Sequence, residues 1–198
     1  MLELQALLGP VQPNQVVRAV PGADSHVPIW LLGSSLFSAK LAAMLGLPFA
    51  FASHFAPDAL MQALEVYRSA FEPSETLTKP HVMVGVAVFA ADSDAEARRL
   101  FTSQQQQRTN LRRGTPGPLP PPIDNMDDYW SPMEKADAEH TATYAAVGSP
   151  ETVRERLTHF IRATQADEVM VTSQIYDHAA RLHSFEIVAG VRDTLPLP

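Results

Sequence analysis

Residues 28–45 read PIWLLGSSLFSAKLAAML, a short apolar run followed at once by a helical pattern. Positions 29–32 are consecutively apolar, which is typical of a parallel strand buried on both faces. The run ends at Gly33, Ser34 and Ser35, where a helix over about 38–45 begins. A strand that ends in such a turn presents backbone N–H groups to a phosphate at the helix N-terminus. The stretch therefore predicts a strand–helix unit with a candidate phosphate-binding turn.

The same alternation of strand and helix continues along the chain. We predict four parallel strands in sequential order, with helices on one outer face, because right-handed crossovers make such strands parallel. Their expected ranges are 29–33, 48–53, 81–89 and 168–173. A complete eight-stranded β/α barrel needs about 250 residues. The predicted fold class is α/β, with about four strand–helix units of a parallel, TIM-like barrel.

Composition excludes several classes of protein. The chain carries 15 basic and 22 acidic side chains, a formal net charge of −7, which argues against a general nucleic-acid binder. It has no cysteine, so disulfides, thiolate catalysis and zinc–thiolate sites are excluded. No apolar run approaches the about 18 residues of a membrane span, and residues 1–10 lack the basic start of a signal peptide. We expect a cytoplasmic protein that does not associate with membranes.

Motif searches also exclude common catalytic chemistries. The seven histidines form no HExxH pattern, and no EF-hand loop is present, so we expect no metal site. The chain has no GxSxG elbow, Walker loop or GxGxxG fingerprint, which leaves serine hydrolases, nucleoside triphosphatases and Rossmann proteins without support.

Three segments interrupt the regular pattern. Residues 1–27 form a lead-in, in which we expect a short helix over 2–8 and irregular chain over 11–27. The run SQQQQR at 103–108 is polar all round, which is typical of a helix exposed to solvent or deprived of its packing surface. Residues 114–138 are proline-rich and predict a long excursion that acts as a lid. The arginines at 108, 112 and 113 are interpreted as a solvated helix face rather than an anion site.

Four stretches together resemble the luciferase-like family of flavin-dependent monooxygenases, whose fold is a β/α barrel. They are PIWLLGSSLFSAKLAAMLGLPFAFASHF at 28–55, RRGTPGPLPPP with YWSP at 112–132, VGSPETVRERL at 147–157, and DEVMVTSQIYDHAARLHSFEI at 167–187. The resemblance covers the second half of the family's barrel. It implies that residues 1–198 form one partial luciferase-like domain.

The resemblance implies an FMN-dependent monooxygenase, in which reduced flavin and O₂ oxidise a small organic substrate. A separate reductase is one source of the reduced flavin. Gly33, Ser34 and Ser35 match the family's phosphate-contacting turn, with Phe37 and Ser38 as second choices. The usual catalytic histidine belongs to the first half of the barrel. No catalytic residue is therefore assigned, and little turnover is expected from this chain alone. The alternative is a shortened, non-catalytic relative that serves as a flavin-binding or assembly module.

Two further residues are candidates for a flavin or substrate contact. His54 follows the second predicted strand, at the end where β/α enzymes keep their chemistry. A structural loop histidine is the favoured interpretation, and a base or flavin contact is the alternative. Tyr176 follows the fourth strand, beside Asp177, which we expect to cap the last helix.

A four-stranded half-barrel has two open edges and a concave apolar face, and such surfaces pair with other chains. Some of the large apolar strand residues must face that concave side; the candidates are Trp30, Phe49, Phe51, Val84 and Val86. We expect a homodimer in which two half-barrels cover each other. The alternative is a monomer whose proline-rich excursion folds over the gap.

Overall fold

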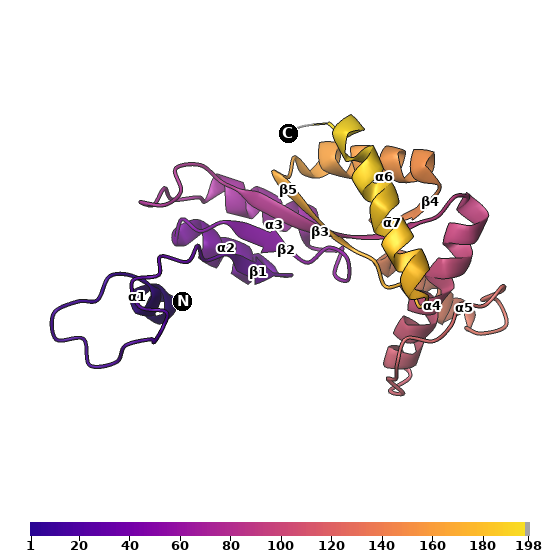
Figure 1. Cartoon of the computed structure of the whole chain (residues 1–198), viewed down its shortest axis with the longest axis horizontal. Helices are drawn as coiled ribbons and strands as arrows, with labels where there is room; N and C mark the ends of the chain where they lie inside the picture. Colours follow the sequence, from indigo (N-terminus) through magenta and orange to yellow (C-terminus); the bar gives the residue numbers. More distant parts are fainter. Residues whose placement is uncertain (197–198) are drawn as a thin grey trace.

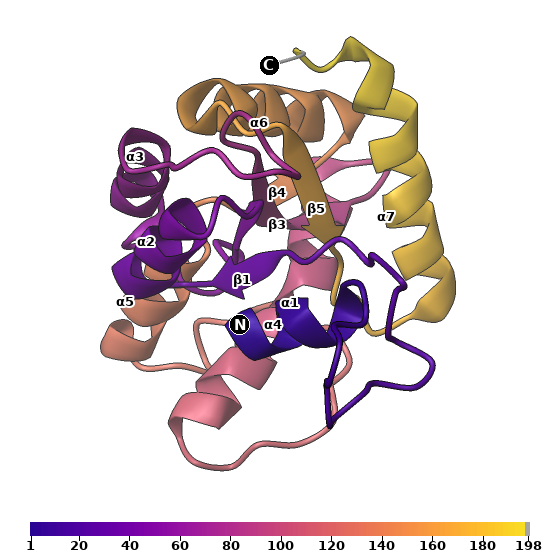
Figure 2. The same cartoon turned by 90° about the vertical axis from the view of Figure 1, so that its left-hand side faces the viewer.

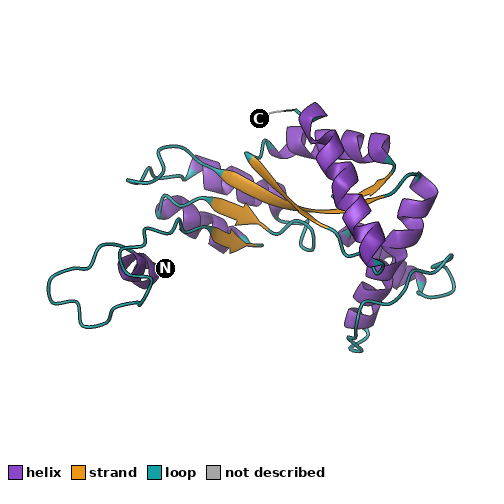
Figure 3. Cartoon of the chain, viewed as in Figure 1, coloured by secondary structure: helices purple, strands orange, loops and turns teal. Residues whose placement is uncertain are grey.

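The chain folds around a parallel five-stranded sheet, seen in a computed structural model that describes residues 1–196. Figure 1 shows the arrangement, and Figure 3 separates helices, strands and loops. The strands are β1 (Leu31–Gly33), β2 (Phe49–Phe51), β3 (Val82–Ala90), β4 (Ala146–Gly148) and β5 (Glu168–Thr172). The helices are α1 (Leu2–Leu8), α2 (Leu36–Met44), α3 (Leu60–Ser69), α4 (Asp94–Arg112), α5 (Pro132–Thr141), α6 (Pro150–Thr164) and α7 (His178–Val191), followed by the 3₁₀ turn η1 (Arg192–Thr194).

The predicted parallel order of four strands is confirmed. β1 pairs with β2, β2 with β3, and β3 with β5, all in parallel register. The prediction missed β4, which pairs with residues 88–90 of β3. Its sequence, Ala-Val-Gly, is too short to show strand periodicity. Residues 197 and 198, the end of the predicted domain, lie outside the described residues.

The main core lies between the sheet and its helices. Leu31, Phe49 and Val82 are register partners and are all buried in one cluster. Side chains of α2, α3 and α6 complete this cluster, and α7 packs against it. α2 contributes the small residues Ala39, Ala42 and Ala43, which let the helix backbone approach the strands closely. These helices cover one face of the sheet, as predicted (Figure 2). The prediction is wrong for the carboxyl end of β3, where Ala87 and Phe89 alternate onto the other face and are buried in a second cluster with side chains of α4.

The residues on the opposite face of the sheet are mostly not those expected to face the concave side. Phe49, Phe51, Val84 and Val86 all belong to the buried cluster under the helices. Leu32 alternates with these positions, and 69% of its surface is exposed. Met170, which pairs with Gly85, and Trp30, two residues before Leu32, share this second face. The exposed apolar surface on this face is thus made by Leu32 and Met170, because four of the five expected residues, Phe49, Phe51, Val84 and Val86, face the helices instead.

The polar run in α4 is neither solvent-exposed nor without a packing surface. Thr102, Ser103, Gln106 and Thr109 are buried, and none of residues 101–110 is exposed. The Thr102 hydroxyl accepts a bond of 2.9 Å from the Ile123 N–H, and Gln106 Nε2 donates to the Pro121 carbonyl at 2.9 Å. Proline-rich backbone supplies few N–H donors, so hydrogen-bonding side chains suit this contact.

The irregular part of the excursion is shorter than predicted, because α5 begins at Pro132. Ser131 caps this helix reciprocally with Glu134. Arg113 holds Glu134 through two hydrogen bonds, of 2.6 and 2.9 Å, and donates to the Tyr129 carbonyl at 2.8 Å. These bonds tie the segment to the end of α4. A lid role for it stays a prediction.

No helix in the described part of the chain is both long and apolar enough to cross a membrane.

Tyr67 joins α3 to the sheet and provides a test of the core. Its ring is fully buried, its hydroxyl donates to the Leu47 carbonyl at 2.8 Å, and it accepts from the His81 N–H at 3.1 Å. Tyr67→Phe leaves both backbone groups unpaired, so we expect a loss of about 1–3 kcal/mol in the free energy of unfolding. Urea denaturation measures it. Tyr176→Phe, at an exposed site, is the control, and equal stability of both variants contradicts the prediction.

The lowered pKa of Glu134 indicates how the α5 region should respond to acid. Hydrogen bonds from Arg113 and from the Ser131 N–H lower the pKa of Glu134 from 4.5 to about 2. A carboxyl group with a depressed folded-state pKa stabilises the fold above its ordinary pKa, and that stabilisation is lost as the pH falls toward the lowered value. We expect the fluorescence of Trp130, in a Trp30→Phe background, to change between about pH 4.5 and pH 2.

Glu134→Gln should remove this transition and give the altered fluorescence already at neutral pH, whereas Glu139→Gln, on the same helix, should retain it. Identical pH profiles for the parent and Glu134→Gln would refute the assignment.

Candidate functional site

The turn between β1 and α2 is held by two serines. The Ser38 hydroxyl donates to the Ser35 carbonyl at 2.7 Å, and the Ser38 N–H donates to Ser35 Oγ at 3.4 Å. Ser35 is the N-cap of α2, and the two side chains form a reciprocal capping box. Both hydroxyls therefore have a structural role, and Ser38 is buried.

The rest of the turn is open to ligands. A Cβ atom at Gly33 would collide with the Ser38 side chain, so only glycine allows the turn to close this tightly. Ser34 is exposed beside it, and 75% of the surface of Phe37 is exposed on the first turn of α2. The first N–H groups of a helix have no partner within the helix, so this end can accept an anion.

His54 lies at the adjacent strand end, over Gly85 of β3. A Cβ atom at Gly85 would collide with its ring, so the glycine makes room for the imidazole. The neighbouring Ser53 hydroxyl donates to the Gly85 carbonyl at 2.6 Å. His54 Nδ1 is buried and lacks a hydrogen-bond partner in the described structure. Burial lowers the pKa of His54, so the ring is neutral at pH 7.

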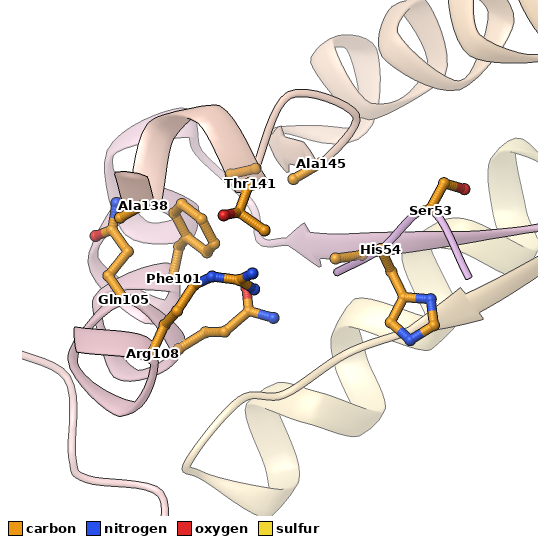
Figure 4. A pocket seen from close by; sticks show the side chains of 11 residues that line it. Ser53, His54, Phe101, Gln105, Arg108, Ala138, Thr141 and Ala145 are labelled. Atoms are coloured by element: carbon orange, nitrogen blue, oxygen red, sulfur yellow. The ribbon is translucent and has the colours of Figure 1, made fainter. Parts of the chain in front are cut away.

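Polar side chains of α4 face His54. Figure 4 shows the Arg108 side chain reaching from α4 toward the space beside His54. Arg108 Nη2 donates to the Phe55 carbonyl at 3.2 Å. Gln104 Nε2 donates at 3.2 Å to Gln174, which follows β5. His54, Gln104, Arg108 and Gln174 line one cavity of about 290 Å³, just under the usual range for small-molecule sites.

The structure gathers some of the predicted residues and separates others. Gly33, Ser34, Ser35, Phe37 and Ser38 form the β1–α2 turn, which lies beside the end of β2 because the Ala52 N–H donates to the Gly33 carbonyl at 3.0 Å. His54 lies in the cavity region instead. Tyr176 is 55% exposed and is not among the residues lining the cavity of His54. Asp177 caps α7, as expected, and accepts from the Ala180 N–H at 2.8 Å.

Three residues that line the cavity, Arg108, Gln104 and Gln174, were not predicted as site residues. The interpretation of Arg108 as part of a solvated face is wrong, since its guanidinium is half-buried and its Nε has no solvent access. One sequence signal was available for Gln174, which lies in the loop after the carboxyl end of β5, where β/α proteins place their functional residues. Among the described residues, no group of three or more histidine, aspartate or glutamate side chains could hold a metal ion.

Known proteins resemble this chain over most of its length. The family model for luciferase-like monooxygenases matches residues 8–168. A luciferase-like monooxygenase of Escherichia coli K12 is 56% identical over 183 residues, which cover 92% of this chain and 55% of that protein. The uncharacterized protein YvbT of Bacillus subtilis is 53% identical over 90% of this chain and 53% of its own length. The chain thus spans about half the length of the relatives it matches.

Solved structures share the fold. Apo-MsnO8 superposes with a TM-score of 0.69 at 31% identity, over 87% of this chain and 56% of its own. The oxygenating constituent of 3,6-diketocamphane monooxygenase from Pseudomonas putida, a type II Baeyer–Villiger monooxygenase solved with FMN, gives 0.60 at 25% identity, over 86% and 49%. The matched fold is therefore part of a luciferase-like TIM barrel, and this chain belongs to the luciferase-like monooxygenase family.

Proposed function

We propose that this chain is the flavin-binding half of an FMN-dependent monooxygenase that acts on a small organic substrate. The observation that carries the proposal is the turn Gly33–Ser34–Ser35. It combines a close-approach glycine, an exposed serine and a helix N-terminus at the end of the sheet that also holds the cavity of His54. A relative of this fold was solved with FMN, which supports the choice of flavin.

The sheet geometry gives the flavin a direction. Gly33 is level with Phe51 of β2 and Val84 of β3, and neighbouring strands lie about 4.8 Å apart, so about 10 Å separates Gly33 from Val84. A phosphate at the β1 turn leaves the rest of the molecule free to extend across the end of β2 toward β3. His54 and Gly85 lie on that path, and Gly85 leaves room above the strand.

The chain's own residues would bind the flavin and shield the cavity from water. Ser34 and the first N–H groups of α2 would hold the phosphate. His54, which is neutral, would contact the flavin ring through a hydrogen-bonding nitrogen that carries no charge. The segment after α4 would keep water from the cavity, since Pro116 and Gly117 line it. The bound flavin would supply the redox chemistry with O₂.

A second candidate is a non-catalytic flavin-binding or assembly module. The exposed apolar side chains on the uncovered face of the sheet favour it, because Leu32 and Met170 need a partner surface to be buried. Turnover measured with reduced FMN and O₂ separates the two functions. Substrate oxidation by the chain supports the enzyme, and FMN binding without oxidation supports the module.

The turn itself is tested by two serine variants. Ser34→Ala should weaken FMN binding by about 1.5–3 kcal/mol, the value of a hydrogen bond to a charged group, and leave stability unchanged. Ser35→Ala should also lower the free energy of unfolding by about 0.5–2 kcal/mol, because it removes the cap of α2. Fluorescence titration with FMN and thermal unfolding measure the two effects.

Ser131→Ala is the matched control, because Ser131 caps α5 away from the turn. It should lose stability without losing FMN affinity. Unchanged FMN affinity in Ser34→Ala and Ser35→Ala would overturn the phosphate assignment.

We also propose that the chain forms a homodimer through its uncovered sheet face. Leu32→Glu places a charge on that face and should shift the molar mass toward the monomer value of 21.7 kDa. Light scattering over a concentration series measures this. Leu182→Glu, at an exposed site on α7, should remain dimeric. A monomeric wild-type chain at high concentration would contradict the proposal.

A further inference from the structure

Arg108 differs from the other arginines at the end of its helix. Arg112 holds Asp137 through bonds of 3.0 and 2.9 Å, and Arg113 holds Glu134 through bonds of 2.6 and 2.9 Å. Arg112 and Arg113 thus each form a bidentate ion pair with a carboxylate of α5. Arg108 forms no ion pair within residues 1–196, and its hydrogen bond goes to the Phe55 carbonyl.

The free guanidinium is also partly removed from water. Arg108 Nε is buried and has no hydrogen-bond partner in the described structure. Burial lowers the pKa of Arg108, but arginine stays charged at neutral pH. A half-buried cation with an unused N–H group is destabilised unless an anion completes its contacts. The nearby Asp137 does not supply these contacts, because both of its carboxylate oxygens accept hydrogen bonds from Arg112.

The cavity beside Arg108 is equipped for an anion. Its lining includes the amide side chains of Gln104, Gln107 and Gln174 and the ring of His54, and no carboxylate. Arg108 also borders two other spaces. The one drawn in Figure 4 holds only about 10 Å³, which is too small for an organic anion, and the one on the α5 side holds about 240 Å³, but its carboxylates, Glu134 and Asp137, are already paired. The uncompensated positive charge therefore belongs to the cavity of His54.

We propose that Arg108, with Gln104 and Gln174, forms an oxyanion subsite that binds the carboxylate or a similar anionic group of the organic substrate. The alternative source of an oxyanion is the flavin phosphate. The β1 turn is about 10 Å across the sheet from Val84 and Gly85 of β3, and Arg108 shares a cavity with His54, which lies over Gly85; Arg108 therefore lies toward the far end of the bound flavin. Naming the ligand as substrate rests on the proposed function; the anion site itself does not.

The experiment measures ligand binding without flavin or turnover. Benzoate and its neutral analogue benzamide are titrated in the millimolar range by ligand-observed NMR. Wild type should prefer benzoate, and Arg108→Gln should weaken benzoate binding about tenfold or more, because a charge-assisted contact is lost. Arg108→Lys should retain a preference for benzoate with weaker binding. Arg98→Gln removes the same charge about 15 Å away along α4 and should bind like wild type.

FMN titrations of the same variants separate the two oxyanion sources. Unchanged FMN affinity in Arg108→Gln, together with lost benzoate binding, supports a substrate subsite even if no turnover is ever detected. Parallel losses of FMN and benzoate affinity would assign Arg108 to the cofactor phosphate and overturn the proposal. Absent benzoate binding in wild type, or equal binding in Arg108→Gln, would also overturn it. If Arg108→Gln does not fold by circular dichroism, equal affinity of Arg108→Lys for benzoate and benzamide would overturn it.

Discussion

The structure depends on the pairing of β3 with three other strands. Its nine residues pair with β2 and β5 through their first part and with β4 through residues 88–90. Because most of these residues are buried, β3 fixes both the helix-covered core and the positions of the strand ends around it. Gly85 sits within this strand, and the missing side chain is what admits the His54 ring. One strand thus determines the core and the floor of the candidate site.

The fold was predictable from the sequence because its signals are local. Consecutive apolar residues mark the buried parallel strands, and capping residues such as Ser35, Ser149 and Asp177 mark the helix starts that the structure contains. Apolar composition alone did not say which face each strand residue takes. Phe49 and Phe51 alternate with Ala50, and the register placed both rings under the helices. Leu32, one residue from the buried Leu31, became the exposed one.

The candidate site was less predictable because its key contacts join distant segments. Polar residues of α4 are usually read as solvent-facing, but Thr102 and Gln106 are buried because proline-rich backbone 15 to 21 residues further on supplies their partners. Burial of Arg108 has the same origin, since it requires the β2–α3 loop, whose Phe55 carbonyl it contacts across 53 residues. No local sequence pattern in α4 indicates that these polar residues or Arg108 are buried. The Gly33–Ser34–Ser35 turn was predictable because its parts are adjacent in sequence.

The three arginines at the end of α4 show how geometry assigns different roles to similar residues. Arg112 and Arg113 meet carboxylates that α5 presents, and these pairs attach the proline-rich segment to the barrel half. Two carboxylates of α5 are thereby used, and the Arg108 side chain reaches toward the space beside His54 without an ion-pair partner among the described residues (Figure 4). Exposed pairs like these contribute little stability individually, but they fix the position of a segment that lines the cavity. The same set of contacts that orders the segment therefore leaves one cation available at the site.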